Sequence, residues 1–133
     1  MRARLLLAVA LGGAVGAVAR ALLGLALPSS ATGFPWTTFS INVVGCFLIG
    51  LLPALEVVRR SEILVATLGP GVLGGFTTLS AGAEESRTLL ASDRPGMALV
   101  YLLATLGAAL LAVAVASRVA AGGDSPRPEG VAS

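Results

Sequence analysis

The sequence GPGVLGGFTTLS, residues 69–80, interrupts an uncharged segment that is long enough to cross a membrane, Ile63–Ala83. At an interior helix position glycine costs about 1 kcal/mol and proline about 3 kcal/mol relative to alanine. The segment therefore predicts two half-helices around an unwound middle rather than one continuous helix. Unwound backbone is tolerated at membrane depth only where it faces protein or water, which makes this segment the first candidate for a functional site.

Similar apolar segments lie on both sides of this one. The chain has 133 residues, of which 56% are hydrophobic and 12% are charged. Its mean hydropathy of +0.92 is far above that of soluble domains. A spanning helix needs about 20 apolar residues, so the chain has room for four spans with short connections. We predict an all-α membrane protein with four transmembrane helices, at residues 5–27, 36–58, 63–83 and 97–116, the third of them broken near its middle.

These spans are expected to form one domain, residues 1–120. Residues 121–133 are rich in glycine, proline and charge, so a disordered tail is expected there. The basic N-terminus followed by an apolar run also imitates a signal peptide, which is the alternative interpretation of the first span. Within that span Gly12 and Gly16 fall on one helix face, at the spacing that lets two helix backbones pack closely.

The composition excludes several classes of function. The chain has no histidine and one cysteine, Cys46, so the usual ligands of zinc, haem and iron–sulfur sites are missing. Its nine basic residues are all arginines and are scattered along the chain, which gives no basic stripe for nucleic acid. We therefore expect no metal-dependent enzyme and no nucleic-acid partner.

Polar residues inside the spans are the candidates for function. Arg20 lies about seven residues inside the first span, where its charge must either snorkel to the headgroups or draw anions toward a vestibule. Asn42 in the second span must hydrogen-bond to the fold or to a water-filled path. Asn42 could act together with the hydroxyls of Thr77, Thr78 and Ser80. We also expect the backbone to be loosened at the neighbouring Gly74 and Gly75, and these groups together could replace the water shell of a small ion. Freed carbonyls suit a hard cation such as sodium, whereas amide and hydroxyl donors suit an anion.

Three motifs in this chain resemble those of a known family. They are GGAVGAVAR at residues 12–20, TFSINVVGCFLIG at residues 38–50 and GVLGGFTTLS at residues 71–80. In this order, within a four-span chain of this size, they closely resemble the Fluc (CrcB) family of fluoride ion channels. The resemblance implies an antiparallel dual-topology dimer with two fluoride pathways. It also implies a structural Na+ at the dimer centre, held by main-chain carbonyls of the third span.

The same resemblance implies roles for individual residues. Gly74 and Thr77 match the sodium positions, Asn42 matches a pore-facing asparagine and Arg20 matches a vestibule arginine. Ser80 matches one hydroxyl of a polar track. We assign three further polar residues to the same fluoride pathway, namely Thr78, Tyr101 and Thr105. The function implied is passive export of cytoplasmic fluoride across the lipid bilayer, without a catalytic step.

One departure from the family pattern bears on conduction. The family's third motif usually continues as Thr-Thr-Phe-Ser-Thr-Phe, whereas this chain has Leu79 and Gly82 in place of the two phenylalanines. Aromatic ring edges carry partial positive charge and can contact an anion, which neither residue can do. A non-conducting partner subunit of a heterodimeric fluoride channel is therefore an alternative. A small multidrug transporter is a weaker one, because that class needs a carboxylate within a span and Glu56 lies near a helix end.

The arginines predict a fixed orientation in the membrane. In a four-span chain the N-terminus, the second connection and the C-terminus share one side, and the third connection lies on the other. The first side carries Arg2, Arg4, Arg59, Arg60, Arg118 and Arg127, and the other carries Arg87 and Arg94. The positive-inside rule makes the richer side cytoplasmic. We therefore favour a heterodimer with a homologous subunit of opposite orientation, with a homodimer as the alternative, in the plasma membrane of a prokaryote.

Overall fold

The computed structural model describes residues 2–30 and 33–122, and this part of the chain is all-helical. Its candidate membrane spans are Arg2–Ala26, Trp36–Ala54, Glu62–Ala91 and Pro95–Gly122, each long and apolar enough to cross a bilayer. The prediction of an all-α chain with four such helices is therefore confirmed. Each predicted span overlaps one of these helices, although the second helix ends earlier than expected and the third and fourth extend further.

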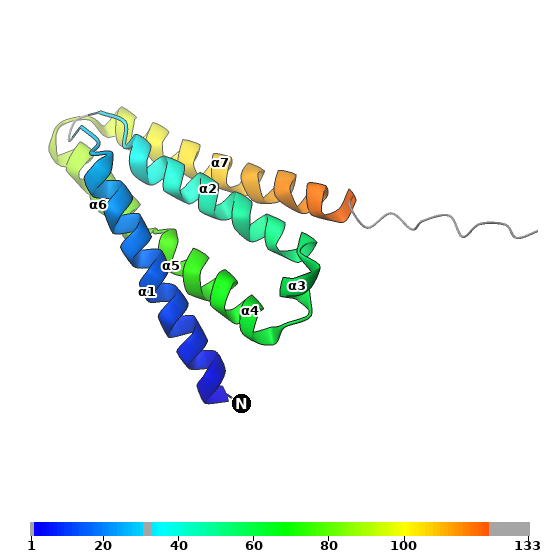
Figure 1. Cartoon of the computed structure of the whole chain (residues 1–133). Helices are drawn as coiled ribbons and strands as arrows, with labels where there is room; N and C mark the ends of the chain where they lie inside the picture. Colours follow the sequence, from blue (N-terminus) through cyan, green and yellow to red (C-terminus); the bar gives the residue numbers. More distant parts are fainter. Residues whose placement is uncertain (1, 31–32, 123–133) are drawn as a thin grey trace, which may run out of the picture.

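Figure 1 shows two pairs of helical segments and how the connections are distributed. The elements are α1 (Arg2–Ala26), α2 (Trp36–Leu51), η1 (Leu52–Ala54), α3 (Glu56–Arg59), α4 (Glu62–Ala66), η2 (Thr67–Leu73), α5 (Gly74–Phe76), α6 (Ser80–Ala91) and α7 (Pro95–Gly122). α1 lies along the segment from α4 to α5, and α2 lies along α7. The start of α1, the α3 to α4 turn and the end of α7 lie toward one end of the molecule, and the other two connections lie toward the opposite end. Successive spans are therefore antiparallel.

The third span changes helix type along its length. η2 is a π-helical segment that contains Pro70, and its wider turns accommodate a residue that has no N–H to donate. Gly74 and Gly75 are helical in α5, so the expectation of loosened backbone at these two glycines was wrong. The extended residue is Thr77, with φ −74° and ψ 156°, and α6 begins at Ser80.

Glycines on α1 explain why the two helical segments pack so closely. Gly12 and Gly16 are buried, and a Cβ atom at Gly16 would overlap the carbonyl oxygen of Val72 in η2. From the other side, a Cβ atom at Gly75 would lie 2.9 Å from the Cα atom of Gly13. Backbone therefore meets backbone along this contact, which confirms the packing role predicted for the small residues of the first span.

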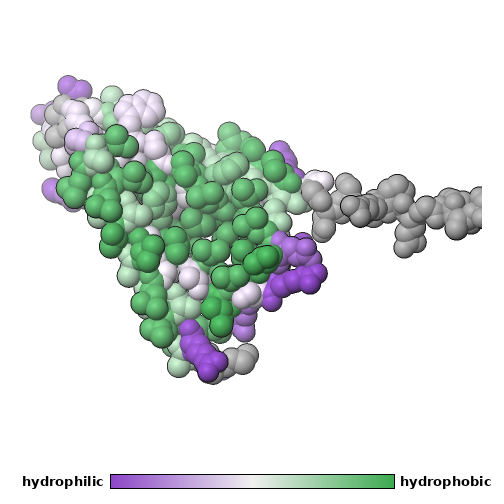
Figure 2. All heavy atoms as spheres, viewed as in Figure 1, coloured by the Kyte–Doolittle hydropathy of each residue, from purple (hydrophilic) through white to green (hydrophobic). Residues whose placement is uncertain are grey.

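The surface is that of a multi-pass membrane protein. Figure 2 shows hydrophobic residues over the body of the molecule and hydrophilic residues gathered at its ends. Large apolar side chains such as Leu25 and Leu110 project outward, whereas few are fully buried. A hydrocarbon surface of this kind is stable in lipid but would associate in water.

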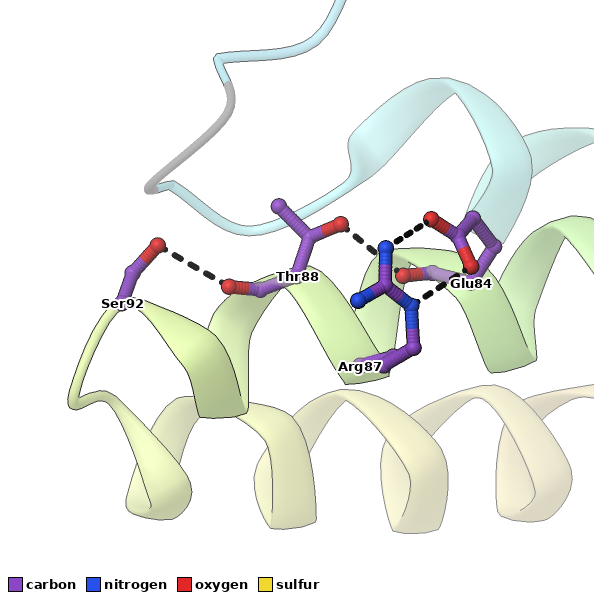
Figure 3. Close-up of polar contacts among 4 residues, drawn as sticks. All are labelled: Glu84, Arg87, Thr88 and Ser92. Atoms are coloured by element: carbon purple, nitrogen blue, oxygen red, sulfur yellow. Dashed lines mark hydrogen bonds and ion pairs between the residues drawn. The ribbon is translucent and has the colours of Figure 1, made fainter.

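α6 carries the polar end of the third span. Arg87 donates to both carboxylate oxygens of Glu84, at 2.9 Å and 2.6 Å, and the two charges neutralise each other on the exposed face shown in Figure 3. The hydroxyls of Thr88 and Ser92 donate to carbonyls one turn earlier in the same helix. The helix continues to Ala91, so the third span extends outward beyond its apolar part.

The predicted tail lies almost wholly beyond the described residues. Its first two residues, Ala121 and Gly122, belong to α7. Residues 123–133, which include Arg127 of the arginine count, lie outside the described residues.

Replacing Gly16 by alanine tests the backbone contact between α1 and η2. Gly16→Ala should destabilise the protein by about 1–3 kcal/mol, because the added methyl group has no room beside Val72. The matched control is Gly24→Ala on the same helix, where a Cβ atom meets nothing within 4 Å. Thermal unfolding in detergent is the measurement, and an equal loss of stability in both variants would contradict the described packing of α1.

Candidate functional site

The site is built around the residues between α5 and α6, Thr77–Leu79, which we call the interruption. Asn42 on α2 pairs with the backbone of Thr78 in both directions. Its Nδ2 donates to the Thr78 carbonyl at 2.9 Å, and its Oδ1 accepts from the Thr78 N–H at 2.8 Å. One side chain thus supplies the two hydrogen bonds that a helix would otherwise give, and Asn42 joins α2 to the interruption.

The interruption leaves carbonyl groups without their helical donors. In a continuous helix the Thr78 N–H would pair with the Gly74 carbonyl, but here it donates to Asn42. Likewise the Ala81 N–H would pair with the Thr77 carbonyl, but it donates to Oγ1 of Thr78 at 3.1 Å. The Thr77 hydroxyl turns back to the Leu73 carbonyl at 3.0 Å. The main-chain oxygens of Gly74 and Thr77 are therefore among the groups that could accept a further ligand.

Arg20 reaches the same region from α1. It lies one helical turn beyond Gly16, on the face that packs against η2 and α5, and its Nε donates to the Gly75 carbonyl at 3.3 Å. Carbonyls at the C-terminal end of a helical segment carry partial negative charge, which favours a cation there. The half-buried guanidinium is held by protein, so this contact favours a fixed positive charge over a snorkelling side chain.

Two cavities flank the interruption and contain all the residues predicted from the sequence. The Arg20 cavity, of about 590 Å³, is lined among others by Arg20, Gly74, Gly75, Thr77, Thr78 and Ser80. The Asn42 cavity, of about 530 Å³, is lined among others by Asn42, Gly74, Thr77, Thr78, Tyr101 and Thr105. Gly74, Thr77 and Thr78 line both, so the interruption forms their shared wall. The structure thus separates the predicted fluoride pathway into two groups, with Arg20 and Ser80 on one side and Asn42, Tyr101 and Thr105 on the other.

The hydroxyl groups along these cavities differ in how they are used. The Oγ atoms of Thr78 and Ser80 lie 3.2 Å apart, and Ser80 is exposed. Oγ1 of Thr105 is buried and has no hydrogen-bond partner within the described residues. A buried hydroxyl left unpaired costs about 1–3 kcal/mol, so Thr105 offers its hydroxyl to whatever enters the Asn42 cavity.

Glu85 is the residue that sequence reasoning missed. It lies beyond the predicted third span, residues 63–83, but the structure places it on α6 facing α2 and α7. Its Oε2 accepts from the Tyr101 hydroxyl at 2.6 Å, and its Oε1 accepts from the Thr38 hydroxyl at 2.6 Å. Thr38 and Tyr101 are 7% and 1% exposed. The helical phase of α6 could have shown this, because Glu85 lies three residues after the buried Gly82, whereas Glu84 points outward.

The groups that line the two cavities are hydrogen-bond donors and backbone carbonyls. No cluster of three or more His, Cys, Asp or Glu residues occurs in the described part of the chain. The cavities offer instead hydroxyl, amide and guanidinium donors, which suit an anion, and freed carbonyls, which suit a hard cation.

Comparison with known proteins places these features in a family. The family described as CrcB-like protein, Camphor Resistance (CrcB), matches residues 7–117. A protein of Streptomyces coelicolor named fluoride-specific ion channel FluC 1 is 50% identical over 111 residues, which cover 82% of this chain and 72% of that protein. FluC 2 of Thermobifida fusca is 46% identical over 116 residues, 84% of each chain. FluC of Caulobacter vibrioides is 44% identical over 113 residues, 82% of this chain and 87% of its own. The chain therefore belongs to the CrcB (Fluc) family of fluoride ion channels, and it is not an enzyme.

Proposed function

We propose that this chain is one subunit of a dimeric fluoride channel that lets cytoplasmic fluoride leave a prokaryotic cell passively. The observation that carries the proposal is the interruption at Thr77–Leu79, fastened by Asn42 and flanked by two cavities with hydrogen-bond donors. Fluoride enters cells as a neutral weak acid, ionises inside and accumulates, so a passive path is enough to export it. The bacterial relatives named as fluoride-specific channels support the same function.

The fluoride path uses donors that can replace water around a small anion. Thr105 supports this role because its buried hydroxyl has no partner in the described residues. Asn42, Thr78 and Tyr101, which are polar residues, line the same cavity. Arg20, which lines the other cavity, adds a positive charge that attracts anions to the mouth of the path. We propose that Ser80 belongs to this second group and that the interruption lies at membrane depth as a break in the third span.

Carbonyl oxygens that have lost their helical donors at the interruption are suitable ligands for Na+. We propose that the main-chain oxygens of Gly74 and Thr77 contribute to a structural Na+ site, because both have lost their helical donors to side chains. A hard cation takes more oxygen ligands than these two, so a second subunit in the opposite orientation would complete the site. Bound there, the ion supplies positive charge that holds two electronegative backbone segments together.

The partner proposed is a homologous subunit rather than a second copy of this chain. The arginine distribution supports one orientation, and Leu79, which is 86% exposed, presents an aliphatic side chain where the family has an aromatic one. A homodimer and a non-conducting role for this chain are the alternatives. Because the chain matches the CrcB family, a small multidrug transporter is no longer an alternative. Fluoride efflux from liposomes that hold this chain alone, and then with its paralogue, is the direct test of conduction.

The first test within the site is Asn42→Asp. The new carboxylate would place a negative charge beside the Thr78 carbonyl, and it would repel an anion in the Asn42 cavity. Fluoride efflux should therefore fall about tenfold or more. The matched control is Ser40→Ala on α2, which lines neither polar cavity. The measurement is the initial efflux rate from liposomes with a fluoride electrode. Unchanged efflux in Asn42→Asp would remove Asn42 from the pathway.

Substitutions at two neighbouring glycines distinguish an effect on the dimer from an effect on the fold of one subunit. A Cβ atom at Gly74 would lie 3.8 Å from the Gly69 oxygen, so the subunit accommodates Gly74→Ala, but the methyl group should weaken a dimer centred there. Gly75→Ala should instead destabilise the subunit, because its Cβ atom would overlap the Gly13 carbonyl. Chemical crosslinking in sodium-containing and sodium-free buffer gives the dimer fraction, and thermal unfolding gives the stability. A fully dimeric Gly74→Ala protein with unchanged sodium dependence would contradict the sodium assignment.

The orientation is tested by labelling single cysteines. In a Cys46→Ala background, Ser92→Cys should react only from outside the cell, and Ser125→Cys should react only from inside. The reason is the excess of arginines on the predicted cytoplasmic side, where each basic residue near a span biases insertion. A membrane-impermeant thiol reagent applied to intact cells and to inverted vesicles measures both sites. Comparable labelling of each cysteine from both sides would show insertion in both orientations and favour the homodimer.

A further inference from the structure

Phe34, in the connection between α1 and α2, packs against Tyr101 of α7. The two ring centroids are 5.4 Å apart and the ring planes meet at 90°, which is an edge-to-face contact. This arrangement sets the positive edge of one ring on the negative face of the other, so it is directional. On its other sides Phe34 contacts the rings of Trp36 and Phe39, at centroid distances of 4.4 Å and 5.4 Å. Phe34 is therefore held firmly while it supports Tyr101.

Tyr101 is 1% exposed, so its ring is packed on all sides. Its hydroxyl donates to Glu85, which fixes the tip of the side chain, whereas the plane of the ring depends on what packs against its faces and edges. Gly82 lies beside the hydroxyl, and a Cβ atom there would be 3.3 Å from it, so the glycine backbone packs closely against the tip. Within the described residues, Phe34 is the aromatic ring that packs against Tyr101, which lines the Asn42 cavity.

We propose that Phe34 is a positioning residue for fluoride permeation. It orients Tyr101 so that the hydroxyl stays on Glu85 and the ring keeps its place in the wall of the Asn42 cavity. Without the Phe34 ring, space opens beside Tyr101, so the tyrosine ring shifts into it and the width of the cavity changes. The inference rests on the proposed fluoride channel, and it gives a role in permeation to the connection that precedes the second span.

A double-mutant cycle on fluoride efflux is the first test. Phe34→Leu should slow the initial efflux rate about fivefold, the size expected from the loss of an aromatic pair, and Phe34→Tyr should retain most of the rate. In a Tyr101→Leu background, which lacks the ring to be positioned, Phe34→Leu should have little further effect. An equal fold loss in both backgrounds would mean that Phe34 acts independently of Tyr101 and would overturn the proposal.

A second measurement does not depend on transport. Tyr101 is the one tyrosine of the chain, so incorporation of 3-fluorotyrosine gives a single fluorine resonance that reports its surroundings. Loss of the Phe34 ring shifts this resonance through the ring current alone, so the line shape is the readout. Phe34→Leu should broaden or split the resonance, because Tyr101 then takes up more than one orientation, whereas Trp36→Leu, which removes a ring that contacts Phe34 and Phe39 instead, should leave one sharp line. A single sharp line in Phe34→Leu, or equal broadening in both variants, overturns the proposal. Broadening specific to Phe34→Leu in a protein that passes no fluoride would uphold the positioning of Tyr101 and count against the proposed channel function alone.

Discussion

Backbone hydrogen bonding at the interruption is the constraint on which the rest of this structure depends. Lipid provides no water to pair with N–H and C=O groups, so every departure from helical geometry in a spanning segment needs partners from protein or a wet cavity. Asn42 supplies two of these partners and Arg20 supplies a third, each from a different helix. The polar residues of this chain are thus explained first by the needs of its own backbone.

Close backbone packing brings these partners within reach. Gly16 and Gly75 let α1 approach the third span until the backbones touch, and Arg20 follows Gly16 by one turn on the same face. A larger residue at either glycine would move α1 outward and carry the guanidinium away from the Gly75 carbonyl. The glycines of the first motif and its arginine therefore act together, because the close packing of α1 determines where the charge of Arg20 lies.

The sequence predicted the spans well and the details of the site less well, for physical reasons. Hydropathy located the four helices, because apolar composition alone determines which segments can cross a bilayer. Glycine and proline content predicted an irregular third span but placed the loosening at Gly74 and Gly75, where packing against α1 keeps the backbone helical. The pairing of Asn42 with Thr78 joins residues 36 positions apart, which no local pattern reveals. Glu85 was missed because it stands next to the exposed Glu84 in a charged stretch, although the helical phase of α6 places the two carboxylates on different faces.

The length of α7 has a consequence for the lipid around this protein. At 28 residues it is about 42 Å long, whereas the hydrocarbon core of a bilayer is about 30 Å thick. The helix must therefore tilt or project its ends, and thinner or thicker membranes change how far it does so. Because α7 lies along α2, which carries Asn42, the two helices tilt together, and the Asn42 cavity tilts with them. Bilayer thickness therefore acts on how this cavity is inclined to the membrane surfaces.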